Sequence, residues 1–102
     1  MYPVLKGASS LQYNESEIHT RREKERAREL RNSRWWQTLI NDASCYYCGS
    51  GLAKAEVTMD HVVPLAQGGR STQGNVVAAC KSCNNAKQDM TAVEWALRTN
   101  QV

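Results

Sequence analysis

The sequence predicts a small α+β domain with helical segments at both ends, and three observations support this fold class. The chain has 102 residues, which suits one compact domain with an extension. Two Cys-x-x-Cys pairs stand 31 residues apart, and two strand-like segments lie between them. Helix-forming sequence precedes the first pair and follows the second.

The first expected element is a long helix that begins at Ser16, its predicted N-cap, and runs to about Asn41. Residues 17–30 are rich in Glu, Arg, Lys and Ala and contain few apolar side chains. Such a helix has little surface to bury, so we expect it to project from the domain or to lie on a partner. Asn32 and Ser33 offer a break, with Ser33 capping a second piece that docks on the core.

The remaining elements are expected on both sides of the second cysteine pair. Residues 55–63 and 75–79 predict two strands, separated by a Gly-Gly turn at residues 67–70. A short helix is predicted over residues 84–87, or slightly beyond. Thr91-Ala-Val-Glu94 fits a capping box that starts a last helix through Arg98.

The charge is concentrated in one segment. The net charge is +3, yet residues 19–34 carry seven of the thirteen basic residues and three acidic ones. This stripe favours a polyanion as partner. No secretory signal and no run approaching the roughly 18 apolar residues of a membrane span is evident, so we expect a cytoplasmic protein without a membrane partner.

The four cysteines predict a structural zinc site. Cys45, Cys48, Cys80 and Cys83 form two pairs, and each pair supplies two thiolates from one tight loop. A four-thiolate site has no open coordination position, so the metal is expected to stabilise the fold without doing chemistry. Two disulfides are one alternative, which a reducing cytoplasm makes less favourable. A redox-active pair is another, but no thioredoxin-like βαβ context surrounds either pair.

Between and just after the knuckles, the sequence Asp60-His61-Val-Val-Pro64, Gly68-Gly69, Asn75 and Asn84-Asn85-Ala-Lys87 carries polar groups suited to hydrolysis. Taken with the cysteines, the string C-x2-C, D-H-x2-P, G-G, N, C-x2-C-N-x2-K resembles the HNH endonucleases. This resemblance covers residues 45–87. It implies a ββα-metal (His-Me) finger and a DNA-cleaving enzyme, bacterial or phage-encoded.

The resemblance also implies a role for each matching residue. His61 would be the general base, and Asp60 a ligand of the catalytic metal. Asn75 would orient the site by fixing the loop that holds His61. Asn84 would be the second metal ligand, and Lys87 would contact phosphate. The implied domains are an extension with a basic helix over residues 1–33 and the HNH nuclease domain over residues 34–102.

Elementary chemistry supports these roles independently. Neutral imidazole, with an ordinary pKa near 6.5, is available as a base at pH 7. The oxygens of Asp60 and Asn84 are hard ligands that suit Mg²⁺ or Mn²⁺ rather than zinc. One difficulty remains, because adjacent strand residues point to opposite faces. Asp60 and His61 can share a site only if the strand ends or bulges there, or if the metal lies at its edge.

Each residue alone has a simpler interpretation: a packed histidine, a solvated acid, a turn former or a helix-terminal residue. His19, in the charged helix, is expected to be exposed and not catalytic. For the basic helix, Arg22 and Arg26 could contact DNA phosphates, or the helix could be a solvated one with acid–base pairs such as Glu23 with Arg26. Arg70 and Lys81 are the stronger individual candidates for phosphate contact.

The predicted function is thus a metal-dependent DNA endonuclease that acts as a monomer and nicks with low sequence specificity. A zinc-ribbon-like DNA-binding or scaffolding module without catalysis is the competing class. It accounts for the cysteines and the basic stripe but leaves the coincidence of Asp60-His61 with Asn84 unexplained. An HNH protein that has lost activity is a third class, and the competent residues at the key positions argue against it.

Overall fold

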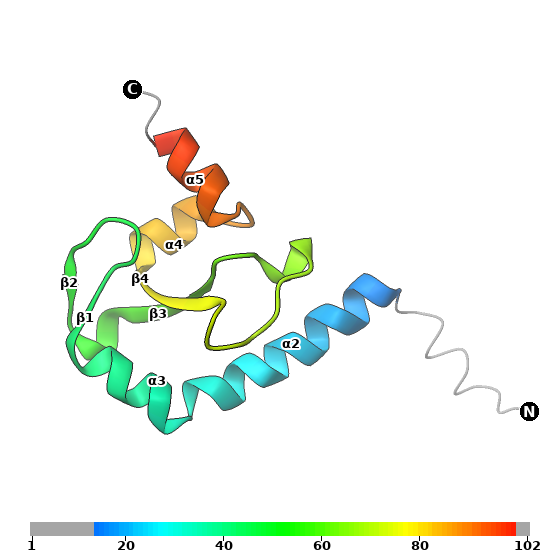
Figure 1. Ribbon diagram of the computed structural model, residues 1–102, viewed down its shortest axis with the longest axis horizontal. Helices are drawn as coiled ribbons and strands as arrows, with labels where there is room; N and C mark the ends of the chain where they lie inside the picture. Colours follow the sequence, from blue (N-terminus) through cyan, green and yellow to red (C-terminus); the bar gives the residue numbers. More distant parts are fainter. Residues whose placement is uncertain (1–13, 100–102) are drawn as a thin grey trace, which may run out of the picture.

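A computed structural model describes residues 14–99 and confirms the small α+β class. Residues 1–13 of the expected extension and residues 100–102 of the expected nuclease domain lie outside the described residues. Figure 1 shows a long helix along one side of a β-hairpin and two shorter helices on the other side. The helices and strands are α2 (Glu15–Arg31), α3 (Arg34–Leu39), β1 (Ala43–Ser44), β2 (Gly51–Leu52), β3 (Val57–His61), β4 (Val76–Cys80), α4 (Lys81–Lys87) and α5 (Ala92–Thr99).

The long helix begins and ends at residues other than those predicted. Asn14, not Ser16, is the N-cap of α2, because its side chain accepts from the backbone of Glu17 while the Glu17 carboxylate accepts from the backbone of Asn14. The helix ends at Arg31 rather than near Asn41. Ser33 then caps α3 by accepting from Trp36 N. This confirms the alternative prediction that the helix breaks at Asn32 and Ser33.

The core lies where α3 meets the β3–β4 hairpin. Trp36 and Ile40 pack on Val76 and Ala78 of β4, and all four are buried. Leu30, Trp35, Leu39, Ala43, Val57 and Met59 cover the edges of this cluster. Burial of large apolar side chains at a single patch explains why α3 docks here and fixes which face of the hairpin points inward.

β3 and β4 form an antiparallel pair in which Asp60 lies opposite Val77 and His61 opposite Val76. Both strands differ from the predicted ranges. β3 spans only Val57–His61, because residues 54–56 form a 3₁₀ turn in which the Glu56 carboxylate accepts from Ala53 N. β4 runs from Val76 to Cys80, and Asn75 just before it accepts from Val62 N through its backbone oxygen and from Val63 N through its side chain.

The expectation that α2 projects from the domain is wrong for the described residues. α2 packs along the loop between β3 and β4, and it buries Glu23 and Ala27 there. The loop itself turns at Gly68, which has a φ of 87°, and at Gly69, where an added Cβ would lie 1.7 Å from the Val63 carbonyl oxygen. Polar contacts, which apolar patterning does not report, hold the helix against this loop.

The β1–β2 ladder and helix α4 lie next to the β3–β4 hairpin. The first cysteine loop is closed by the β1–β2 ladder, which the sequence did not predict. α4 follows β4 directly and starts at Lys81, earlier than predicted, because Cys80 Sγ accepts from Cys83 N as its cap. The α5 capping box is confirmed, with Thr91 and Glu94 bonding each other's backbone. Across residues 14–99, no helix combines the length and apolar character needed to cross a bilayer.

Candidate active site

The end of β3 opens into a cleft of about 340 Å³ that contains Asp60, His61 and Asn84 together. β3 ends at His61, so the difficulty of two adjacent strand residues is removed by the strand ending there. By register, His61 shares a face with Met59 on the core side, whereas Asp60 shares a face with Thr58 on the α4 side. Both side chains border the cleft from opposite sides of the strand end.

His61 is half-buried and lies against the loop that α2 covers. Its Nε2 is 2.9 Å from Ser71 Oγ. Burial lowers the pKa of the imidazole below its ordinary value of 6.5, Asp60 opposes this shift, and the Lys87 cation adds to it. The neutral, proton-accepting form therefore predominates at pH 7, as a general base requires.

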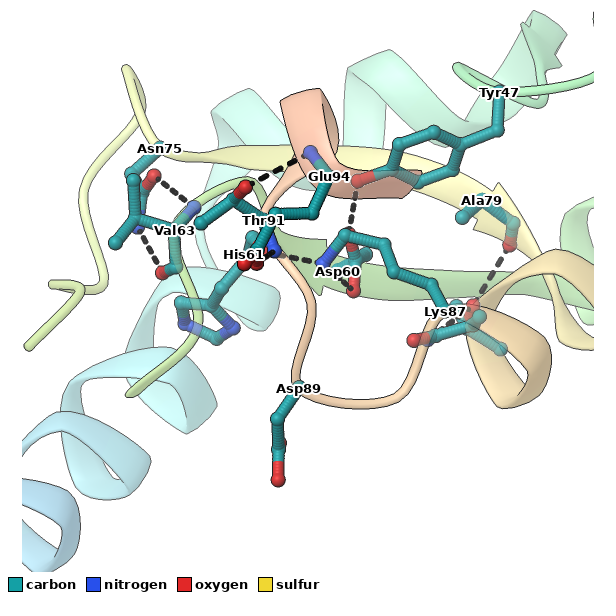
Figure 2. A network of polar contacts seen from close by, with 12 residues as sticks. Tyr47, Asp60, His61, Val63, Asn75, Ala79, Lys87, Asp89, Thr91 and Glu94 are labelled. Carbon is teal, nitrogen blue, oxygen red and sulfur yellow. Dashed lines mark hydrogen bonds and ion pairs between the residues drawn. The ribbon is translucent and has the colours of Figure 1, made fainter. Parts of the chain in front are cut away.

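Asp60 is buried, and its carboxylate holds two partners (Figure 2). Lys87 Nζ lies 3.1 Å from Oδ2, and the Tyr47 hydroxyl donates to the same oxygen. Burial and the Asp60 charge raise the pKa of the Tyr47 phenol, so it stays protonated as a donor. These two donors hold the buried Asp60 carboxylate in one orientation at the end of β3.

Lys87 occupies a different environment from the one the phosphate-contact role requires. Its side chain is 0% exposed, and besides Asp60 its Nζ donates to the backbone oxygen of His61 at 3.0 Å. The ammonium also lies 5.8 Å from the centre of the Tyr47 ring. Fully buried and paired, Lys87 cannot reach a surface phosphate in this arrangement, so its contacts assign it to holding the strand end.

Asn84 borders the cleft, and Thr58 holds its amide in place. The Thr58 hydroxyl donates to Ala79 O at 2.7 Å and accepts from Asn84 Nδ2 at 2.9 Å. With Nδ2 engaged, Oδ1 is the acceptor left over, and within residues 14–99 it has no hydrogen-bond partner. An amide fixed in this orientation offers the hard oxygen that the sequence suggested.

Asn75 bridges the two ends of the loop that follows β3, as Figure 2 shows. Its Oδ1 accepts from Val63 N at 2.9 Å, while Nδ2 donates to the carbonyl oxygens of Val63 and Arg70 at 3.0 and 2.8 Å. Three bonds from one side chain close the loop just beyond His61. This geometry is what a loop-fixing role for Asn75 would need.

The four cysteines converge at the other end of the hairpin. Their sulfur atoms all lie within 4.8 Å of one another, and none forms a disulfide. A tetrahedral metal with thiolates at about 2.3 Å has sulfur–sulfur edges of about 3.8 Å, so the cluster fits a metal ion. The contact with Ser50 lowers the pKa of Cys48 to about 6, whereas burial raises that of Cys83 to about 12. A bound metal ion deprotonates the thiols that coordinate it.

The predicted phosphate contacts are divided between surfaces. Arg22, Arg26 and Arg70 line one surface pocket, and Arg26 also pairs with Glu23 at 2.6 Å. Lys81 is exposed but borders a separate pocket beside Cys80. The structure thus gathers three of the arginines on the α2 side of the loop and leaves Lys81 apart.

Several residues around the site escaped the sequence analysis. Tyr47 carried a signal only in its place inside a cysteine knuckle, and Ser71 carried none. Thr20 and Lys24 of α2 also border the cleft. His19 was expected to be exposed, yet it is half-buried, and its Nε2 lies 2.8 Å from Gly69 O. A charged helix gives no sequence signal for which of its polar residues will be buried.

An antiparallel hairpin followed directly by a helix, with a histidine at the strand end and a four-cysteine cluster behind it, has the arrangement of a ββα finger with a structural metal site. Residues 45–96, just over half of the chain, match the family model described as HNH endonuclease. The chain therefore belongs to the HNH endonuclease family, as its residue pattern predicted.

Two curated relatives show how much of a larger protein this chain resembles. It is 40% identical over 68 residues to the CRISPR-associated endonuclease Cas9 of Corynebacterium diphtheriae, a match that covers 66% of this chain and 6% of that protein. It is 34% identical over 58 residues to the Cas9 of Actinomyces naeslundii, covering 56% of this chain and 5% of that protein. The chain thus matches about a twentieth of the length of each relative.

Proposed function

We propose that this chain is a divalent-metal-dependent DNA endonuclease that hydrolyses phosphodiester bonds. The observation that carries the proposal is the meeting of Asp60, His61 and Asn84 in one cleft, although Asn84 lies more than twenty residues further along the chain. Membership of the HNH endonuclease family supports the nuclease class. The bacterial Cas9 relatives favour DNA as the substrate and agree with the expected cytoplasmic location.

In this proposal, His61 accepts a proton from a water molecule whose oxygen bonds to the phosphorus. The bond from phosphorus to the leaving sugar oxygen breaks, and that oxygen takes a proton from solvent. Asp60 and Asn84 Oδ1 would hold Mg²⁺ or Mn²⁺, and Asn75 would keep the His61 loop in place. When bound, the cation neutralises charge that develops on the phosphate oxygens. The cleft holds a single set of such residues, which fits nicking of one strand by a monomer.

The cysteine cluster, by contrast, would hold zinc without taking part in the reaction. Four sulfur donors suit zinc and leave no position for water or substrate. Its sulfurs come from the β1–β2 loop and from the junction of β4 and α4, so the bound metal would fix the hairpin whose first strand carries Asp60 and His61. We expect about one zinc per chain.

Phosphate contacts would come from α2 and from the loop between β3 and β4. Arg22, Arg26 and Arg70 share a pocket that a DNA backbone could follow, and Lys24 borders the catalytic cleft itself. Lys24 is exposed, so it takes the role first expected of the buried Lys87. Loss of one such contact, as in Arg70→Gln, should weaken binding to all sequences alike and lower the salt slope by about 0.9.

One observation favours the competing class, a zinc-ribbon-like DNA-binding module without catalysis. Lys87 already neutralises Asp60, the residue on which a catalytic cation would depend. A carboxylate has about four lone-pair positions, however, so these contacts leave room for a metal.

A supercoiled-plasmid assay with Mg²⁺ or Mn²⁺ separates the two classes. We expect the native chain to nick and His61→Ala to be inactive, with zinc content unchanged in both. Asn84→Ala should also lose activity, whereas the exposed neighbour Asn85→Ala should keep it. DNA binding by the native chain without cleavage in any divalent metal would replace the enzyme proposal with the binding module.

A further inference from the structure

Ser71 connects helix α2 to the side chain of His61. Its backbone N donates to Glu23 Oε1 at 2.6 Å, and its hydroxyl donates to the backbone oxygen of Glu23 at 2.6 Å. The same hydroxyl oxygen lies 2.9 Å from His61 Nε2. Both Ser71 and Glu23 are buried, although they are 48 residues apart.

These contacts decide which imidazole nitrogen carries the proton. A serine hydroxyl has one hydrogen, and the Glu23 carbonyl can only accept, so that hydrogen points to Glu23. Ser71 Oγ then has only lone pairs to offer, and His61 Nε2 must donate to it. In the neutral imidazole, Nδ1 is therefore the nitrogen with the free lone pair. Within residues 14–99, Nδ1 has no hydrogen-bond partner.

Glu23 is itself held firmly in place. Its exposed fraction is 2%, and its second carboxylate oxygen accepts from Arg26 at 2.6 Å. One turn earlier on the same helix, His19 contacts Gly69 O in the same loop. A buried carboxylate with a hydrogen-bond partner on each oxygen stays in one orientation. Glu23 therefore fixes the position of Ser71 relative to α2. α2 lies outside the residues that match the family model.

We propose that Glu23 and Ser71 are positioning residues that hold His61 with Nε2 protonated and Nδ1 free to accept a proton from water. The inference deepens the proposed function and rests on His61 being its base. It assigns α2 to the active site as the support of the base. Neither residue touches the substrate in this scheme, because each acts through the imidazole.

The first test reads the tautomer directly, without any cleavage reaction. Nitrogen-15 NMR of the zinc-loaded chain, at about pH 8 where imidazole is neutral, distinguishes the two ring nitrogens of His61. We expect the Nε2-protonated form in the native chain and a mixture of tautomers in Ser71→Ala. The Thr72→Ala variant changes the next, exposed residue and serves as the matched control. A native His61 protonated at Nδ1 would overturn the inference, whether or not the chain is a nuclease.

The second test measures the effect on the reaction. Ser71→Ala should lower kcat by roughly 10- to 100-fold, the range seen when a residue that orients a metal-bound histidine is lost, with little change in KM. Ser71→Thr keeps the hydroxyl and should restore most of the rate. Glu23→Gln should lower kcat less, because its amide oxygen can still accept from Ser71 N, and Glu25→Gln on the exposed face is its control.

The outcomes separate the two proposals. Full kcat in Ser71→Ala, with zinc and fold retained, would overturn the positioning role. If no variant and no native chain cleaves DNA, the proposed function fails, and the NMR comparison still decides whether Ser71 sets the tautomer. If Ser71→Ala does not fold, the tautomer of the native chain and the activity of Ser71→Thr decide the inference.

Discussion

The two ends of the β3–β4 hairpin are held in place by different means. At one end, two cysteines from the β1–β2 loop and two from the junction of β4 and α4 have their sulfurs within 4.8 Å of one another. At the other end, the loop after His61 is held by hydrogen bonds from Asn75 and from Glu23 of a distant helix. The cysteine end depends on local loops with fixed spacing, whereas the histidine end depends on buried polar contacts between remote segments.

The difference has a physical consequence. A metal bound to four thiolates acts on the whole domain, because its binding free energy becomes folding free energy. Hydrogen bonds at the histidine end contribute only about 1–3 kcal/mol each, but they fix the geometry of individual side chains. Perturbing the first end should therefore unfold the chain, and perturbing the second should mainly change how the site is arranged.

Removal of the metal from the cysteine cluster should have the largest effect. Structural zinc contributes about 10–16 kcal/mol in small domains, which exceeds or matches the stability of a typical domain, about 5–15 kcal/mol. We expect the chelated chain to lose its helical circular dichroism signal and to recover it when zinc is restored. Omitting Mg²⁺ alone is the control and should leave the spectrum unchanged. A cooperatively folded, metal-free chain would show that the two ends differ less than we argue.

Breaking the buried ion pair between Lys87 and Asp60 should have the second-largest effect on stability. Lys87→Met leaves the Asp60 carboxylate buried without its cation, and we expect the free energy of unfolding to fall by about 3–5 kcal/mol. Lys81→Met, at an exposed position on the same helix, should change it by less than about 0.5 kcal/mol. Urea unfolding of both variants checks this. Equal, small effects would mean that the Lys87–Asp60 pair contributes no net stability.

The contribution of Glu23 should depend on pH. The hydrogen bond from Ser71 N holds the pKa of Glu23 below its ordinary value of 4.5. A lowered pKa in the folded state means that the carboxylate stabilises the fold above pH 4.5 and that this stabilisation is lost as the pH falls through the lowered value. At pH 7, the free energy of unfolding of Glu23→Gln should be about 1.5–3 kcal/mol lower than that of the native chain.

The measurement is the difference in unfolding free energy between Glu23→Gln and the native chain, obtained by urea unfolding at each pH from 7 down to the lowest pH at which both chains retain zinc. This difference should begin to shrink as the pH falls below 4.5 and should be smallest below the lowered pKa of Glu23, where both side chains are neutral. Glu25→Gln, whose side chain is exposed, should show no such trend. A constant difference across the range would contradict the assigned role of the Glu23 charge.

The sequence predicted that the four cysteines converge because each Cys-x-x-Cys pair is a local pattern, although it did not predict the β1–β2 ladder beside them. Each Cys-x-x-Cys pair needs only its own spacing to form a metal knuckle. The first pair precedes the strand with Asp60 and His61, and the second lies at the start of the helix with Asn84, so the two pairs also locate these residues. The capping box at Thr91 is equally local. For such features, a residue pattern within a few positions is enough.

The histidine end could not be predicted in the same way. Nothing near Glu23 in the sequence distinguishes it from Glu25, yet one is buried and the other exposed. Which acid faces the loop depends on the crossing of α2 over a segment 48 residues later. The burial of Lys87 likewise depends on where Asp60 and Tyr47 meet in space. Long-range polar pairs of this kind leave no periodic signal.

The smallest expected effect lies at Thr58, one residue pair from the cysteine end of the hairpin. Thr58→Val conserves volume but removes the hydroxyl that fixes the Asn84 amide, so we expect a loss of only about 1 kcal/mol in unfolding free energy. Because Asn84 Oδ1 would then no longer be held in one orientation, the Mg²⁺ concentration for half-maximal cleavage should rise by roughly tenfold. Thr38→Val, exposed on α3, is the matched control. An unchanged metal requirement would place the Asn84 amide outside the metal site, while a large loss of stability would show that this part of the hairpin behaves like its cysteine end.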